Sequence, residues 1–377
     1  MSNTCRHSDS HQHSILCIIP PHMLELVAMR GNNNQVKMAK KLLKTHQAAR
    51  EQRQSKMGST MIEQQNLTTN AVANQDHFAY VTPEHHQPPK AKKIHREIYI
   101  GNNKAALPGL PFRSEGDEAT GDEDVDRAYD GAGDVFDLYQ NEYHRCSIDG
   151  KGLPLVSTVH HRRNFNNAFW NGEQMVYGDG DGKLFKTFTE LSIIGHEMTH
   201  GVVQFSGGLV YQGQSGALNE SIADVFGALT LQRKQQQCAC EADWLIGRGV
   251  LASSIHGQAL RSLKAPGTAY NDAVLGQDPQ PYHMDLFVQT QSDNGGVHIN
   301  SGIPNHAFYL FAQYLGGNAW EKPGQIWYQS LQTLNNPHAT FSQWAEKTLD
   351  TAIQLHGSGS WEYGMLKRAW RLVGIHA

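Results

Sequence analysis

The sequence of 377 residues contains no long apolar run. No window approaches the roughly eighteen consecutive apolar residues that a membrane-spanning helix needs, so no such helix is expected. The apolar stretch nearest the N-terminus, SILCII (14–19), is stopped at once by two prolines and is followed by no small-residue cleavage site. Because the apolar core of a secretory signal is longer than this, a standard signal peptide is not expected.

Cysteine is scarce, with five residues in the whole chain. This odd number argues against a disulfide framework, and no C-x-x-C pair is present to hold a structural zinc ion. Cys238 and Cys240 are separated by a single residue, which is too close for an easy, unstrained bridge. This cysteine usage fits a reducing compartment.

Charged residues make up only 18% of the chain and are spread unevenly. Basic residues outnumber acidic ones within residues 1–100, whereas the remainder is acidic. A basic N-terminal arm can indicate nucleic-acid binding, but the charges of residues 36–54 are spaced as on a helix, with no aromatic residue for base stacking. We therefore expect this segment to pack against its own acidic body, and we expect no nucleic-acid partner.

The head of the chain, residues 1–92, differs from the rest in composition. Residues 1–14 are polar and histidine-rich, residues 18–31 and 36–54 predict two helices, and residues 55–93 lack any sustained period, as a linker would. The chain then shows strand-like alternation and glycine-rich turns from residue 96 to about 190. Helical periodicity follows at 188–205, 216–233, 301–315, 325–334, 341–356 and 361–373. The pattern predicts an α+β architecture, with a β-rich lobe before an α-helical lobe.

The stretch IIGHEMTHGVV (193–203) carries polar groups inside an otherwise apolar helical run. His196 and His200 stand four residues apart, so both imidazoles leave one face of a helix, and Glu197 lies near the rim of that face. With this spacing, H-E-x-x-H, a helix offers two imidazoles to zinc and a carboxylate to the metal's water. A chance match is the alternative in a chain with 21 histidines, so a third ligand is needed.

The next predicted helix offers that ligand. SGALNESIADVFGAL (215–229) contains Glu220, and an antiparallel return of this helix would bring the carboxylate to the metal. Asp224, one turn later, can accept the free N–H of a ligating imidazole, with Asn219 beside it. Carboxylates are rarely buried unless they are paired or bind a metal, which disfavours a merely solvated role for Glu220.

Four segments in this order resemble the thermolysin family of neutral metalloproteases: NNAFWNGEQMVYGDGDG (166–182), HEMTH, NESIAD and DNGGVHINSGIPNHAFY (293–309). The resemblance runs from about residue 96 to 377. It implies a two-lobed zincin fold, with a β-rich lobe at 93–205 that ends in the HExxH helix at the junction and an α-helical lobe at 206–377. It also implies a zinc-dependent endopeptidase that acts on peptides or proteins as a monomer.

The resemblance assigns roles to individual residues. One catalytic zinc would be held by His196, His200 and Glu220, with Glu197 as general base and Asp224 orienting His196. Tyr211 and His298 would stabilise the oxyanion, and Asp293 would hold His298. Asn167 and the backbone of Ala168 would bind the peptide as an added strand, and Arg261 would contact the carbonyl side of the leaving half. An apolar pocket lined by Ile193 or Leu260 would favour a hydrophobic residue after the cut.

The head has a resemblance of its own. IIPPHML (18–24) is similar to the short Pro-Pro-containing precursor segment of protealysin-like members, which implies a zymogen. Residues 1–92 would be propeptide and linker, with an inhibitory part that begins near residue 15 and ends between 56 and 92. The inhibitory residues would be Pro20, Pro21, His22, Met23 and Leu24. An inert leader is one alternative, and a latch in which the Cys17 thiolate fills the open zinc position is another.

The chain departs from thermolysin where that family binds calcium. The carboxylates of the double calcium site are expected at Ser192, Leu231, Leu245 and Arg248, and only Asp243 remains; Gln258 stands where a further site has aspartate. The DGDG segment (179–182) lacks the length and terminal glutamate of a calcium loop, so we interpret it as a glycine turn. Calcium binding is therefore expected to be weak or absent.

Two other functions share parts of this pattern. A zinc aminopeptidase has the same ligand set but needs an acidic anchor for the substrate's amino group, and we find none with a family signature. A catalytically silent binding or effector protein could retain the fold, but every zinc, base and oxyanion position holds a competent residue. The family's extracellular role favours secretion without a standard signal peptide, and a cytoplasmic location is the alternative.

Overall fold

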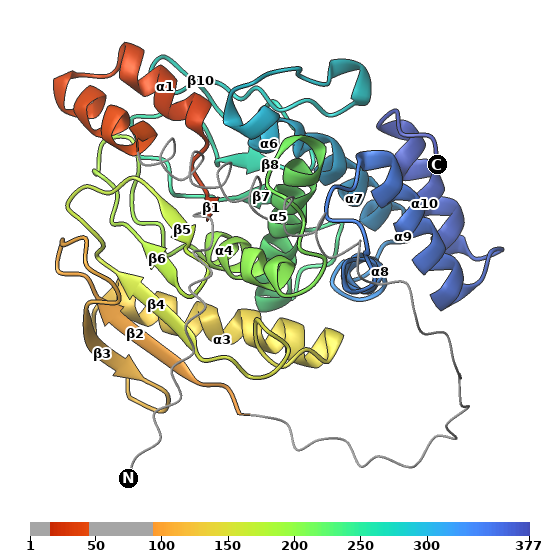
Figure 1. Cartoon of the computed structure of the whole chain (residues 1–377), viewed down its shortest axis with the longest axis horizontal. Helices are drawn as coiled ribbons and strands as arrows, with labels where there is room; N and C mark the ends of the chain where they lie inside the picture. Colours follow the sequence, from red (N-terminus) through yellow and green to blue (C-terminus); the bar gives the residue numbers. More distant parts are fainter. Residues whose placement is uncertain (1–15, 45–92) are drawn as a thin grey trace, which may run out of the picture.

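The computed structural model describes residues 16–44 and 93–377 (Figure 1). The linker, the end of the predicted second helix and any processing boundary before residue 93 lie outside these residues. Figure 1 shows the sheet and α3 (Glu123–Tyr143) on one side, the helices near the C-terminus on the other, and α4 (Leu191–Gln204) and α5 (Gly213–Gln235) between them. The predicted α+β, two-lobed fold is confirmed.

The sheet has six strands in the order β1-β5-β6-β4-β2-β3. β2 runs parallel to β4 and β4 parallel to β6, whereas β3, β5 and β1 are each antiparallel to their neighbours. Its strands are β1 (Leu16–Cys17), β2 (Arg96–Ile100), β3 (Leu110–Ser114), β4 (Leu155–Val159), β5 (Ala168–Trp170) and β6 (Met175–Tyr177). The head thus supplies an edge strand to a sheet that is otherwise made by the main body.

Helix α3 was not predicted, and the expectation of strands and turns throughout residues 96–190 is wrong there. Its N-terminus is capped by Asp122, whose side chain accepts the N–H groups of Asp124 and Val125. Gly131 and Gly133, which indicate turns in a sequence, lie inside the helix. A Cβ at Gly131 would stand 2.6 Å from Ile194 Cδ1, so this glycine allows α3 to pack closely on α4.

The predicted helices of the second lobe are present to within a few residues. They are α7 (Gly302–Leu315), α8 (Lys322–Gln332), α9 (Phe341–His356) and α10 (Trp361–Leu372). A further helix, α6 (Asp293–Asn300), was missed, because residues 293–296 all have positive φ. Short elements fill the stretch between α5 and α6: β7 (Leu245–Ile246), β8 (Arg261–Ser262), β9 (Asn271–Asp272), β10 (Gly276–Gln277) and η1 (Met284–Leu286). Among the helices within the described residues, none combines the length and the apolar character that a membrane span requires.

Helices α4 and α5 form the centre of the molecule. Twelve residues of α4, from Ser192 to Val203, are all buried, so this helix faces protein on every side. A Cβ at Gly195 would lie 2.9 Å from the Cα of Gly227, which means that only glycine at this crossing lets the two backbones approach so closely. The close crossing brings the polar face of α4 within side-chain reach of α5.

The head folds onto this body. α1 (Pro21–Arg30) begins with proline in its first turn, as predicted, and residues 33–44 form a second helix. Met23, Leu24 and Val27 are buried and belong to the main core. A Cβ at Gly276 of β10 would lie 2.5 Å from Leu26 Cδ1, so α1 packs directly on the β9–β10 hairpin (Figure 1). Within the described part of the basic segment, Ala39 and Leu42 are buried in the main core, whereas its attraction to an acidic surface stays a prediction.

Cys238 and Cys240 form a disulfide, which corrects the expectation from their spacing. The turn after α5 holds their Cα atoms 5.4 Å apart, within the ordinary range for bridged cysteines. The backbone of this turn is also held by a distant segment of the chain, because the Ala239 N–H donates to the Gly317 carbonyl. Cysteine usage therefore gives no support to a reducing compartment.

Candidate active site

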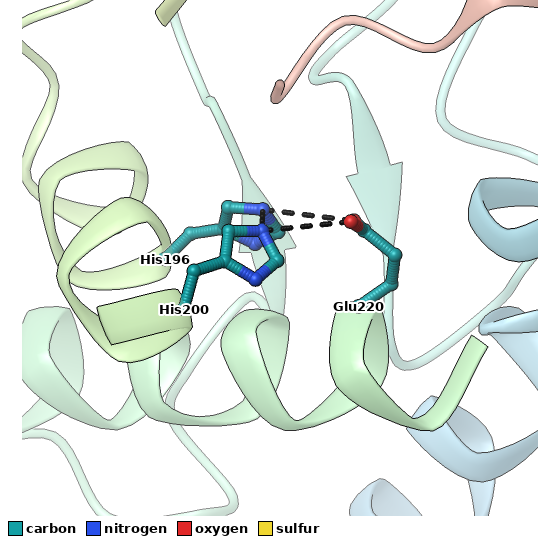
Figure 2. A group of neighbouring side chains, drawn as sticks. All are labelled: His196, His200 and Glu220. Atoms are coloured by element: carbon teal, nitrogen blue, oxygen red, sulfur yellow. Dashed lines mark hydrogen bonds and ion pairs between the residues drawn. The ribbon is translucent and has the colours of Figure 1, made fainter. Parts of the chain in front are cut away.

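Two imidazoles of α4 and one carboxylate of α5 meet in the interior (Figure 2). The Nε2 atoms of His196 and His200 lie 2.9 Å apart. The Glu220 carboxylate lies 3.6 Å from the first of these nitrogens and 3.5 Å from the second. All three side chains are fully buried, and their ligand atoms lie within 4.8 Å of one another.

Neighbouring oxygens fix the tautomers of both rings. Asp224 Oδ1 lies 2.8 Å from His196 Nδ1, and Asn219 Oδ1 lies 2.9 Å from His200 Nδ1. Because each Nδ1–H donates to an oxygen, each Nε2 is left with a lone pair that points at the other and at Glu220. Burial lowers the pKa of His200 to about 3, which keeps this imidazole neutral.

This cluster fits a zinc ion. Two neutral imidazoles and a carboxylate are the donor set of a catalytic zinc site, which leaves a fourth position open. Two facing lone pairs and a nearby carboxylate repel one another unless a cation lies between them. Glu220 Oε2 is buried and has no hydrogen-bond partner among the described residues, as a metal ligand would.

Glu197 lies next to this cluster. Its Oε2 accepts the Trp170 N–H at 2.8 Å, whereas its Oε1 is buried with no hydrogen-bond partner in the described part of the chain. Burial, followed by the negative charge of Glu220, raises the pKa of Glu197 well above its ordinary value. A carboxylate in this state binds a proton readily, which suits a general base. Sequence reasoning missed the contribution of Trp170, because it is a backbone contact made by the neighbouring strand.

Asp293, His298 and Tyr211 form a chain that reaches the cluster. Asp293 Oδ1 lies 2.6 Å from His298 Nδ1, and His298 Nε2 lies 3.2 Å from the Tyr211 hydroxyl. That hydroxyl donates to Glu220. Burial works to lower the pKa of His298, but Asp293 and Glu220 outweigh it and raise the pKa to about 9. His298 is therefore a cationic donor at neutral pH.

The peptide-binding residues named from the sequence all contact the head. Asn167 Oδ1 accepts the Ile19 N–H at 3.1 Å, and the Ala168 carbonyl accepts the Ile18 N–H at 3.2 Å. Arg261 donates to the Ile18 carbonyl at 3.0 Å. The structure therefore gathers these three residues around one extended segment.

The two residues expected to line a pocket also lie together. Leu260 and Ile193 are buried, and both face Gly247, where a Cβ would lie 2.9 Å from Leu260 Cδ1 and 3.4 Å from Ile193 Cδ1. Asn305, which sequence reasoning missed, donates to Asp224 Oδ2 at 2.9 Å. The sequence did contain a signal for Asn305, because it is a polar residue within the largely apolar helix α7.

A second group of possible metal ligands joins Asp124, His160 and Asp179, whose ligand atoms lie within 4.8 Å of one another. His160 Nδ1 lies 2.9 Å from Asp179, and its Nε2 lies 3.0 Å from Asp122. The hydrogen bond to Asp179 is the main cause that raises the pKa of His160 to about 9. Protonated His160 thus pairs with Asp179 and Asp122, and Asp124 accepts instead from the hydroxyls of Thr187 and Thr189. In the DGDG segment, Asp181 accepts the N–H groups of Lys183 and Leu184, as in a turn.

The region of the expected calcium residues is held by other interactions. Ser192 donates its hydroxyl to Glu190, the N-cap of α4, and accepts the Gly247 N–H at 2.9 Å. Arg248 pairs with Asp243. Within residues 16–44 and 93–377, no group of three metal ligands forms at this place.

Comparison with known proteins agrees with this geometry. Residues 31–204 match the thermolysin metallopeptidase catalytic domain, and residues 207–375 match the thermolysin metallopeptidase alpha-helical domain. The chain belongs to the thermolysin metallopeptidase family. It is a zinc metalloendopeptidase.

Two relatives and one solved structure are similar along much of their length. The chain is 41% identical to an extracellular metalloprotease of Pectobacterium carotovorum subsp. carotovorum over 96% of each protein. It is 48% identical to protease PrtS of Photorhabdus sp. (strain Az29), over 75% of this chain and 76% of that protein. The structure of the precursor of protealysin, a metalloproteinase from Serratia proteamaculans, has a TM-score of 0.81 at 41% identity and covers 96% of this chain and 99% of that one.

Proposed function

We propose that the chain is the zymogen of a neutral endopeptidase that cuts before hydrophobic residues, with Glu197 as its general base. The convergence of His196, His200 and Glu220 in a buried site carries this proposal. Zinc bound there would polarise the scissile carbonyl and lower the pKa of a water to about 7. The remaining chemistry falls to groups of the chain itself.

Glu197 would take the proton of the attacking water and deliver it to the departing amine. Its raised pKa suits the interval between the two transfers, in which the carboxyl group must hold the proton. His298 and Tyr211 would donate to the oxygen on which negative charge develops. Asp293 keeps His298 protonated and fixes its ring.

The substrate would bind along β5 as an added antiparallel strand. Asn167 and Ala168 offer a side-chain and a backbone acceptor there, and Arg261 offers a donor for a carbonyl beyond the cut. Ile193 and Leu260 support a preference for a hydrophobic residue after the scissile bond.

The head would act as the inhibitor, in a segment that begins near residue 15 and ends between residues 56 and 92. Ile18 and Ile19 are fully buried between β5 and Arg261, which disfavours an inert leader. Cys17 lies within the described residues but outside the group of possible metal ligands, and its carbonyl faces His298 at 2.9 Å. This arrangement favours occlusion of the cleft by the backbone over a thiolate latch.

Residues 93–205 and 206–377 would form the two catalytic lobes, and residues 1–92 the propeptide and linker. The extracellular naming of the Pectobacterium relative supports secretion.

Internally quenched peptides test the function. Protein from which the metal has been removed with a chelator should cleave no peptide. Added zinc should restore cleavage before a hydrophobic residue, whether the amino terminus of the peptide is free or blocked. Cleavage only of peptides with a free amino terminus would indicate an aminopeptidase. No cleavage by zinc-loaded protein from which the head has been removed would indicate a silent binding protein.

A further inference from the structure

One peptide bond of the head lies between the two groups that would act on a substrate. The Cys17 carbonyl oxygen lies 2.9 Å from His298 Nε2, the proposed oxyanion donor. On the other side of the same bond, the Ile18 N–H donates to the Ala168 carbonyl at 3.2 Å and also acts on the carboxylate of Glu197, the proposed base, whose pKa it helps to lower. A scissile bond needs this placement, with its oxygen at the oxyanion donor and its nitrogen at the group that returns the proton.

The flanking contacts hold the bond in this register. β1 pairs antiparallel with β5, with Cys17 opposite Phe169 (Figure 1). After the bond, the Ile18 carbonyl accepts from Arg261, and the Ile19 N–H donates to Asn167. The residue that follows the bond is a fully buried isoleucine, which matches the hydrophobic preference proposed for substrates.

We propose that the Cys17–Ile18 bond is a self-cleavage site, cut within the same molecule when the protein is loaded with zinc; this rests on the proposed function. A water oxygen adds to the Cys17 carbonyl carbon, and Glu197 takes the water's proton. The bond from that carbon to the Ile18 nitrogen breaks, and Glu197 passes the proton to the nitrogen. The new carboxylic acid then gives its remaining proton to the amino group, so the products are a carboxylate on Cys17 and a protonated amino group on Ile18.

This cut does not release the inhibitor. The buried anchors Met23, Leu24 and Val27 and the contacts with Asn167 and Arg261 all lie on the Ile18 side of the bond. The new amino group remains beside the Glu197 carboxylate, where opposite charges attract. The fragment that begins at Ile18 therefore stays in the cleft, and cleavage of added peptides stays low until this fragment is removed.

The experiment follows the full-length chain by intact mass and N-terminal sequencing after zinc is added to chelated protein. We expect a chain that begins at Ile18 and a peptide that ends at Cys17, formed at a rate that does not change over a roughly 100-fold range of protein concentration, since the step is intramolecular. Glu197→Gln should stay whole, and Cys17→Ser and Ile18→Leu should be cut. A rate that rises with protein concentration would overturn cleavage within one molecule.

Ile18→Asp separates this inference from the proposed function. A carboxylate in a buried apolar position is strongly disfavoured, so this variant should displace the head, escape the cut and cleave an added quenched peptide. If Ile18→Asp cleaves the peptide while wild-type protein never yields a chain beginning at Ile18, the self-cleavage site is wrong and the peptidase stands. If zinc-loaded Ile18→Asp cleaves no peptide and wild-type protein stays whole, the proposed function fails.

Hydrogen exchange on the metal-free protein gives a readout that needs no hydrolysis. The amides of Ile18 and Ile19 should be protected in the full chain, because they donate to Ala168 and Asn167. Asn167→Ala should lower protection of the Ile19 amide more than that of the Ile18 amide. Fast exchange at both amides of the wild-type protein would overturn the register.

Discussion

Arg261 donates two hydrogen bonds of 2.8 Å to Asp224, from Nε to one carboxylate oxygen and from Nη2 to the other. Both side chains are buried, and the same carboxylate also accepts from His196. Burial works to raise the pKa of Asp224, but Arg261 and His196 reverse this and hold it below its usual range. One carboxylate thus connects a possible metal ligand, His196, with Arg261, which donates to the Ile18 carbonyl.

Asp224→Asn is expected to weaken zinc binding and folding together. Zinc affinity should fall about 10–100-fold, because His196 Nδ1 then faces a neutral amide in place of the carboxylate that makes the imidazole a more basic ligand. The free energy of unfolding should fall by about 3–5 kcal/mol, because Arg261 becomes a buried charge without a counterion. Competition with a chromophoric chelator and urea unfolding of the metal-free protein measure the two effects.

The matched control is Asp243→Asn, which removes the partner of Arg248. That pair is partly exposed, so we expect a loss of at most about 1 kcal/mol and unchanged zinc affinity. Equal effects of the two substitutions would contradict a special role for Asp224.

Glu197→Gln should keep zinc and the fold but lose peptide hydrolysis by about 10²–10⁴-fold or more, since an amide cannot take the proton of the attacking water. The assay uses head-free enzyme and a quenched peptide, with zinc content measured on the same sample. Near-normal turnover with a full complement of zinc would rule out Glu197 as the base.

Much of this site could be predicted from the sequence because its geometry is local. His196, Glu197 and His200 lie within about one helical turn, so helix periodicity places them together. Glu220 lies on the next helix and reaches them through the close crossing of α4 and α5. Their partners Asn219 and Asp224 are also placed by the period of α5.

Other contacts depend on tertiary packing, which local patterns do not encode. The Trp170 N–H reaches Glu197 only because β5 lies beside α4, and His160 meets Asp122 and Asp179 across three separate segments. α6 was missed because Asn294 and its neighbours have left-handed backbone angles that no helix propensity describes.

The thiol of Cys17 is expected to be dispensable for latency. The backbone of this residue contacts His298 and pairs with β5, and Cys17→Ser leaves that backbone unchanged. Full-length wild-type and Cys17→Ser proteins should therefore show equally low cleavage of an added peptide. If that one substitution releases activity, the thiolate is the inhibitor and occlusion by the backbone is wrong.

We expect acid pH to weaken the docking of the head on the main body, because His22 becomes protonated. This side chain is half-buried, its Nε2 lies 3.3 Å from the Tyr270 hydroxyl, and its Nδ1 is buried with no hydrogen-bond partner among the described residues. Burial lowers its pKa to about 4, while Asp293 works to raise it and the cations His298 and Arg261 to lower it further.

The direction of this effect follows from the lowered pKa. A histidine that is harder to protonate in the docked state stabilises docking above its free pKa of about 6.5, and that stability is lost as the pH falls toward 4. Amide exchange of residues 16–30, corrected for intrinsic rates, should show that the equilibrium constant for docking falls by on the order of 100-fold as the pH approaches 4. His22→Gln should flatten this dependence; an unchanged profile in that variant would assign the effect to other groups.

Calcium should matter little for stability. A calcium ion needs six to eight oxygen ligands, and Ser192, Leu231, Leu245 and Arg248 stand where the thermolysin double site has carboxylates. Arg248 pairs with Asp243 and so places a cation where a metal would have to bind. Because a ligand stabilises the native state by RT ln(1 + [L]/Kd), a site too weak to fill contributes nothing. Thermal unfolding of zinc-loaded protein, from chelated trace to millimolar calcium, should give a constant midpoint; a rise of about ten degrees would correspond to several kcal/mol and would mean that a calcium site is intact.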